Sequence, residues 1–135
     1  MSEPVIELRA AGKIFPNGLR ALQPVDLKVM QGEVVAIVGP SGCGKSTLLR
    51  MIAGLSAPSS GSLFVAPEIA NEPGRIGFVF QQPTLMPWAR GQANVRLPLD
   101  LAGLDSAASV SKVMRALSLV GLTDFSGAYP HELSG

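Results

Sequence analysis

The start of the chain alternates between hydrophobic and polar positions. Residues 5–9 follow this two-residue period, which predicts a strand that exposes one face, and residues 21–29 form a second run that we expect to be a strand. The turn sequence Pro16-Asn17-Gly18 lies between them, so we expect the two strands to be antiparallel. Pro24 has no N–H to donate to a neighbour, and it therefore places the second strand at the edge of a sheet.

Two later runs are apolar without alternation. Residues 34–38 and 76–80 are each almost wholly hydrophobic, as parallel strands are when helices cover both faces of their sheet. We therefore expect both to be buried strands, with residues 34–38 at the centre. A shorter strand is expected over residues 62–66, and residues 68–74 look irregular.

Apolar residues at helical spacing predict two helices. The first runs from Lys45 to Ala53 and stops at Gly54, which can take the left-handed conformation of a helix end. The second follows Ser106 as N-cap and ends at Gly121. Its apolar side chains fall on one face, which we interpret as a packed core face: Val110, Val113, Met114, Leu117 and Val120. A short helical turn is expected over residues 123–127.

Composition limits the classes of protein that fit. The chain has 135 residues, of which 47% are hydrophobic, so it can bury a core. Its net charge of +1 gives no global field for nucleic acid or an anionic membrane, and we expect no nucleic-acid partner. No apolar run is long enough to span a membrane. The single cysteine, Cys43, excludes an internal disulfide and a cysteine-built metal site.

Between the apolar run 34–38 and the first helix, the sequence fits the phosphate-binding pattern GxxxxGK[ST]. Glycines at 39, 42 and 44 can turn successive backbone N–H groups inward, and the following helix adds its own unpaired N–H groups. Such a loop binds the polyphosphate of a nucleotide such as ATP. Its candidate contacts are Gly39, Pro40, Ser41, Gly42, Cys43, Gly44, Lys45, Ser46 and Thr47.

Three side chains of this loop have distinct predicted roles. Lys45 carries a mobile positive charge for the β- and γ-phosphates, and the Ser46 hydroxyl is placed to hold Mg²⁺. Thr47 would contact the α-phosphate side. The thiol of Cys43 is interpreted as a bystander, because the loop uses its backbone N–H. The competing interpretation is a glycine-rich turn that only joins a strand to a helix.

Four separated segments together resemble the ATP-binding subunit of ABC transporters. They are residues 39–47 (GPSGCGKST), 49–55 (LRMIAGL), 78–83 (FVFQQP) and 133–135 (LSG). Within that family, residues 80–88, 94–99 and 129–135 resemble the importers for nitrate, sulfonates and taurine. The resemblance implies an α/β fold of the P-loop NTPase type, with a mixed sheet core, an antiparallel β region and a helical subdomain. Residues 1–85 would form the ATP-binding core and residues 86–135 the helical subdomain.

The resemblance also implies roles outside the phosphate loop. Phe15 matches the aromatic residue that stacks on adenine, although it could be a core side chain that follows a strand. Gln81 matches the glutamine that reaches Mg²⁺ or the attacking water, although it could merely end a strand. Ser134 and Gly135 match the start of the signature motif, which binds the γ-phosphate held by a second subunit. Trp88 would face the membrane partner or pack within its own helical region. His131 precedes the signature and does not match the family's switch histidine.

By resemblance, the protein would work at the cytoplasmic side of the membrane as a peripheral ATPase subunit. Its implied partners are a second ATP-binding subunit, transmembrane permease subunits and, indirectly, a periplasmic or extracellular solute-binding protein. The sequence contains no Walker B aspartate or catalytic glutamate, so we expect these 135 residues alone to hydrolyse almost no ATP. We interpret the chain as an N-terminal fragment. The alternatives are a soluble ABC-type ATPase acting in DNA repair or on the ribosome, and a non-hydrolysing nucleotide-binding module.

Overall fold

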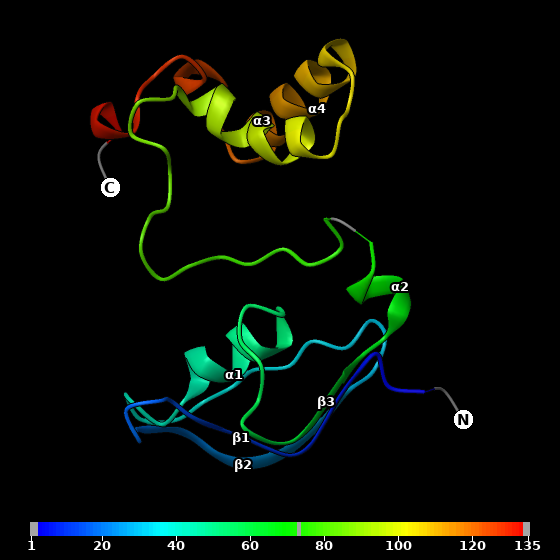
Figure 1. The fold of residues 1–135 in the computed structure, drawn as a ribbon. Coiled ribbons are helices and arrows are strands. Elements are labelled where there is room, and N and C mark those ends of the chain that lie inside the picture. Colours follow the sequence, from blue (N-terminus) through cyan, green and yellow to red (C-terminus); the bar gives the residue numbers. More distant parts are fainter. Residues whose placement is uncertain (1–2, 73, 134–135) are drawn as a thin grey trace. The chain divides into compact units, whose positions relative to one another are not determined.

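The computed structural model describes residues 3–72 and 74–133. The chain forms two compact units, Met1–Phe78 and Val79–Gly135. The described residues form, in chain order, β1 (Ile6–Ile14), β2 (Arg20–Val29), α1 (Lys45–Ile52), β3 (Ser60–Val65), α2 (Pro67–Ala70), α3 (Gly91–Leu101), α4 (Ser106–Leu119) and the short 3-10 helices η1 (Thr123–Phe125) and η2 (Pro130–Glu132) (Figure 1).

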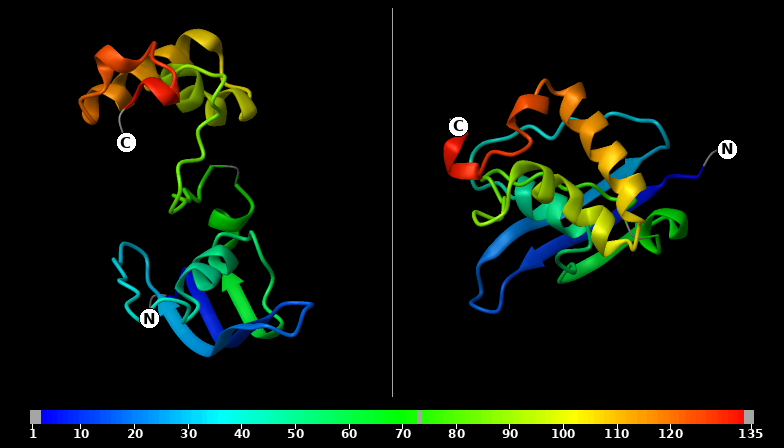
Figure 2. Two further views of the ribbon diagram at one scale, coloured as in Figure 1. Left: turned by 90° about the vertical axis from the view of Figure 1, so that its left-hand side faces the viewer. Right: turned by 90° about the horizontal axis from the view of Figure 1, so that it is seen from above.

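The first unit is built on an antiparallel sheet with strand order β2-β1-β3. Ile6 pairs with Val29 on one side and with Val65 on the other. The predicted antiparallel pair is therefore confirmed, and so is the edge position of the strand that contains Pro24. Helix α1 lies against one face of this sheet, as the left view of Figure 2 shows.

The core of this unit lies between α1 and the sheet. Leu8, Ala11 and Leu22 from the strands contact Leu48 and Met51 from the helix, and all five are buried. Leu48 and Met51 are three residues apart in sequence, so they lie on the same helical face. Burial of a side chain of this size stabilises the fold by about 1.5–3 kcal/mol. The predicted helix 45–53 is confirmed to within one residue, because α1 ends at Ile52 and Ala53 is its C-cap.

The expectation of a central strand over residues 34–38 is wrong for this structure. These residues belong to no strand, and the side chains of Val34 and Val38 are 96% and 92% exposed. Ile37 alone of the five packs against the core cluster of this unit. A strand requires a neighbour with which to exchange backbone hydrogen bonds. The described sheet, β2-β1-β3, offers this segment no parallel neighbour.

The second expected apolar strand, residues 76–80, is also not a strand here. Val79 is 94% exposed. The physical reason is the same, since no described strand pairs with it. The strand expected over residues 62–66 is present as β3, which begins two residues earlier and ends one residue earlier. Helix α2 overlaps the start of the segment 68–74 that was expected to be irregular.

Helices α3 and α4 pack together in the second unit. The N-cap of α4 is Asp105, so the expectation of Ser106 as the cap is wrong by one residue. The buried face of α4 consists of Ser109, Val113 and Leu117, spaced four residues apart. Val110 and Val120 are exposed, and the predicted apolar face is therefore only partly correct. Among the described residues, we find no helix with the length and hydrophobicity of a membrane span.

Candidate nucleotide-binding site

The segment between residues 38 and 45 forms a tight loop that leads directly into α1. Gly42 and Gly44 have φ values of 80° and 102°, in the left-handed region that side chains with a Cβ rarely adopt. This backbone form turns the loop without steric conflict at either position. The local conformation therefore agrees with the residue pattern that predicted it.

Gly44 also fixes the loop to the sheet. A Cβ built at Gly44 would lie 2.5 Å from the Ala21 carbonyl oxygen and 2.7 Å from the Leu22 Cδ1 atom. Both contacts are closer than real Cβ atoms tolerate, so only glycine allows the backbone to approach β2 at this point. The sequence pattern demanded a glycine here, but it gave no sign that the reason includes packing against β2.

The start of α1 is arranged to attract an anion. Its N-cap is Gly44, which has no side chain to cap the helix, and its first turn contains no acidic residue. The first N–H groups of a helix have no acceptor within the helix, and the helix dipole is positive at this end. The N-terminus of α1 is thus uncapped by protein side chains and favours a phosphate.

Lys45 reaches back across the loop from the first position of α1. Its Nζ donates hydrogen bonds to the carbonyl oxygens of Gly39 and Pro40, both at 2.7 Å, and lies 3.6 Å from the Sγ of Cys43. These contacts hold the ammonium group over the same backbone that would surround a polyphosphate. A single positive charge, two left-handed glycines and a helix N-terminus therefore converge on one loop.

The loop fits Mg²⁺ less completely than it fits phosphate. Ser46, in the first turn of α1, supplies a hydroxyl of the kind that Mg²⁺ accepts. Within the described parts of the chain, no group of three or more His, Cys, Asp or Glu side chains could hold a metal ion. Ser46 and the phosphates of a nucleotide would be its ligands here, with water filling the remaining positions.

Phe15 lies at the hairpin between β1 and β2, directly after the pair Ile14–Arg20. Its side chain is 37% exposed, so it is not a buried core residue. The Nζ of Lys13 lies 5.7 Å from the centre of its ring and donates a 2.6 Å hydrogen bond to the Ala57 carbonyl. Sequence reasoning missed Lys13, although it lies only two residues before Phe15 at the end of β1.

The structure leaves the other predicted contacts of a nucleotide untested. Gln81 lies in the second unit and is exposed, so its contact with a nucleotide stays a prediction. Ser134 and Gly135 lie outside the described residues. Trp88 is 76% exposed, which argues against the alternative that it packs within its own helical region.

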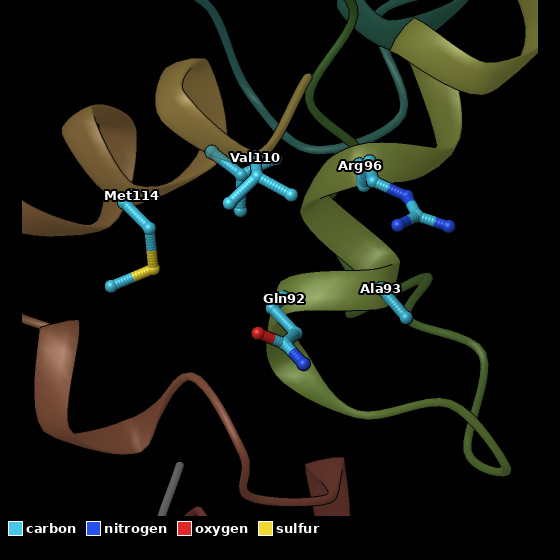
Figure 3. Close-up of a pocket in the computed structure, with 6 residues that line it drawn as sticks. Gln92, Ala93, Arg96, Val110 and Met114 are labelled. Carbon is cyan, nitrogen blue, oxygen red and sulfur yellow. The ribbon is translucent and has the colours of Figure 1, made fainter. Parts of the chain in front are cut away.

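A pocket of about 270 Å³ lies between α3 and α4 (Figure 3). Figure 3 shows Gln92 and Arg96 on α3, and Val110 and Met114 on α4. None of the predicted nucleotide contacts lines it. We therefore regard it as a gap between two packed helices rather than as the candidate site.

Comparison with known proteins agrees with this geometry. The model of the ABC transporter family matches residues 22–135, a range that includes the whole loop and α1. The chain belongs to the ABC transporter family. The resemblance seen in the four sequence segments is thus confirmed at the level of the family.

Curated ABC relatives differ in the solutes that their names state. The chain is 42% identical to the aliphatic sulfonates import ATP-binding protein SsuB 1 of Xanthomonas axonopodis pv. citri, with 100% of this chain and 54% of that protein aligned. It is 41% identical to the methionine import ATP-binding protein MetN of Corynebacterium efficiens, with 96% of this chain and 40% of that protein aligned. The chain therefore spans about half the length of the curated relatives it matches, or less.

A solved ABC structure confirms the fold class. The chain superimposes on the ATP-binding cassette MJ0796, described as a dimeric post-hydrolysis state bound to ADP and Pi, with a TM-score of 0.81 and 28% identity. The match covers 96% of this chain and 63% of that structure. The fold is that of a P-loop NTPase of the ABC type, of which this chain forms the antiparallel sheet, the phosphate loop and two helices of a helical region.

Proposed function

We propose that this chain is part of the ATP-binding subunit of an ABC importer, and that the loop 39–47 binds the phosphates of ATP. The observation that carries the proposal is the uncapped, glycine-initiated N-terminus of α1 with the Lys45 ammonium held across it. Lys45 would hold the β- and γ-phosphates, and Ser46 would hold Mg²⁺. Phe15 would stack on the adenine, because its ring is exposed beside the first residues of β2.

The remaining roles rest on sequence resemblance. Gln81 would orient water or contact Mg²⁺, and Ser134 and Gly135 would bind the γ-phosphate in a second copy of the subunit. Bound ATP supplies the free energy that such transporters use, while the residues of this chain bind, orient and neutralise its phosphates. Trp88, on an exposed loop, would contact the transmembrane permease. The subunit would then be peripheral to the cytoplasmic face of the membrane, with a solute-binding protein as an indirect partner.

Replacement of Lys45 by alanine tests this function in a complete subunit that contains these residues. A hydrogen bond to a charged group contributes about 1.5–3 kcal/mol, so the affinity for Mg-ATP should fall about tenfold to a hundredfold and hydrolysis should be lost. Lys112→Ala removes the same charge from the exposed side of α4 and serves as a control. Hydrolysis by Lys45→Ala at the rate of the control would refute the assignment of the loop.

We further propose that the transported solute belongs to the nitrate, sulfonate and taurine group. The support is the sequence of residues 80–88 and 129–135 together with the similarity to a sulfonate importer subunit. The test is whether a complete subunit that contains these residues complements a strain that lacks the ATP-binding subunit of its sulfonate importer. Growth on an aliphatic sulfonate as sole sulfur source supports the proposal, whereas rescue only of a methionine importer mutant contradicts it.

A further inference from the structure

Helix α3 begins in an unusual way. Its N-cap residue, Arg90, makes no capping hydrogen bond with its side chain. Instead, the backbone N–H groups of Gly91 and Gln92 donate to the carbonyl oxygens of Ala128 and Ser126, both at 2.8 Å. Two of the N–H groups that a helix leaves unpaired are therefore satisfied by a segment that lies far along the chain.

Gly91 permits this close approach. A Cβ at this position would lie 3.2 Å from the Phe125 carbonyl oxygen and 3.4 Å from that of Ser126. The first distance is tighter than ordinary van der Waals contact and the second is at its limit, so a side chain would require the segment to move by a few tenths of an ångström. The start of the helix and residues 125–128 are thus fitted to each other at the level of the backbone.

The side chain of Arg90 reinforces the same contact. Its Nη1 donates a 2.9 Å hydrogen bond to the Gly127 carbonyl oxygen, and its Cζ lies 5.0 Å from the centre of the Tyr129 ring. A planar guanidinium group can lie on an aromatic ring and donate to a carbonyl at the same time, which a lysine ammonium does less well. Tyr129 begins the short stretch that leads through η2 to Ser134.

Asn94, one turn further along α3, hydrogen-bonds the loop that precedes Arg90 in the sequence. Its Oδ1 accepts a 2.7 Å hydrogen bond from the Met86 N–H, and its Nδ2 donates to the carbonyl oxygens of Met86 and Ala89 at 3.2 and 2.9 Å. The loop that carries Trp88 is therefore tied to the same turn of α3 that receives residues 126–129.

We propose that Arg90 is a positioning residue that fixes residues 126–129, the segment that precedes the signature motif in the sequence. This inference rests on the proposed function, in which the signature binds the γ-phosphate held by a second subunit. Arg90 touches no nucleotide. It sets where the preceding segment lies by its contacts with Gly127 and Tyr129, while Asn94 anchors the same helix turn to the loop of Trp88.

The test measures ATP hydrolysis by the complete subunit carrying Arg90→Met, which keeps an unbranched, flexible side chain and removes both contacts. We expect kcat to fall about threefold to tenfold, because a cation–π contact and a charged hydrogen bond at an exposed position are lost. The KM for ATP and the melting temperature should stay unchanged. Arg96→Ala, which removes an exposed ion pair with Asp100 from the same helix, is the control and should retain kcat.

Variants of the partner ring make the test specific. Tyr129→Phe keeps the ring and should retain kcat within twofold, whereas Tyr129→Leu should lower it as Arg90→Met does. Combining Arg90→Met with Tyr129→Leu should add little to either alone, since both remove the same contact. Arg90→Lys, which can keep the bond to Gly127 but stacks less well, should give an intermediate kcat.

Two results would overturn the inference. One is a kcat for Arg90→Met equal to that of the control while Lys45→Ala abolishes hydrolysis, which leaves the proposed function intact. The other is a fall in kcat accompanied by a raised KM and a lowered melting temperature, because that pattern indicates general destabilisation. Retention of hydrolysis by Lys45→Ala would instead refute the proposed function itself.

Discussion

Replacing Gly44 by alanine tests whether the phosphate loop is seated on β2 as the structure shows. Gly44 has two separate reasons to be glycine. Its φ of 102° is left-handed, and a Cβ would lie 2.5 Å from the Ala21 carbonyl oxygen. Gly42, in the same loop, shares only the first reason, since its φ is 80° and a Cβ there would meet nothing within 4 Å. Comparing the Gly42→Ala and Gly44→Ala variants therefore separates the cost of the left-handed backbone from the cost of the close contact with β2.

The expected magnitudes follow from these two differences. An alanine in the left-handed region costs about 1–2 kcal/mol, so Gly42→Ala should lower the free energy of unfolding by about that amount. Gly44→Ala carries the same cost and adds an overlap with backbone atoms, which cannot rotate away as a side chain can. Overpacking of this kind costs about 1–3 kcal/mol, and the total for Gly44→Ala is therefore about 2–5 kcal/mol.

Equilibrium unfolding in urea, monitored by circular dichroism for both variants and the parent protein, measures the difference. The two glycines lie two positions apart in one exposed loop, so their effects on the unfolded chain should nearly cancel in the comparison. A Gly44→Ala variant no less stable than Gly42→Ala would show that the loop does not approach β2 so closely. The packing argument for the site would then fail.

Two further changes test other parts of the chain. Hydrogen bonds from Arg9, the larger cause, and from Lys28 lower the pKa of the Glu7 carboxyl. The carboxylate therefore stabilises the fold fully above its ordinary pKa of about 4.3, and this stabilisation is lost as the pH falls through the lowered pKa. The stability advantage of the parent over Glu7→Gln should be constant near neutral pH and shrink in acid unfolding titrations; an advantage that grows in acid contradicts this. Asn94→Ala should release the loop of Trp88, the only tryptophan, and raise the quenching of its fluorescence by acrylamide, whereas unchanged quenching would show that Asn94 does not order that loop.

The local structures that could be predicted from the sequence are those whose cause is local. The alternation of residues 5–9, the second run over residues 21–29 and the turn between them gave the antiparallel pair, because each strand finds its partner a few residues away. The glycine pattern and the apolar spacing of residues 48–52 gave the loop and α1. In each case the residues that determine the element lie within it or within a few residues of it.

The predictions that failed depend on distant partners. Residues 34–38 have the composition of a buried parallel strand, but composition cannot supply the neighbour that a ladder needs. The apolar stripe of α4 failed for a related reason. Which residues of a helix are buried depends on where its neighbours lie, and in α4 Ser109 is buried whereas Val110 is exposed. The contacts of Gly44 with β2 and of Gly91 with residues 125–126 likewise join segments that no short sequence pattern connects.

The phosphate loop keeps its form although the run before it is not a strand, and the reason lies in what α1 contacts. Leu48 and Met51 fasten the helix to Leu8, Ala11 and Leu22. Gly44 contacts β2 at the start of that helix. The Lys45 ammonium group hydrogen-bonds the carbonyl oxygens of Gly39 and Pro40 within the loop. The anion-attracting groups are therefore positioned by the antiparallel sheet through α1, rather than by residues 34–38. It follows that changes in the α1 core should disturb nucleotide binding more than polar changes at the exposed Val34 and Val38.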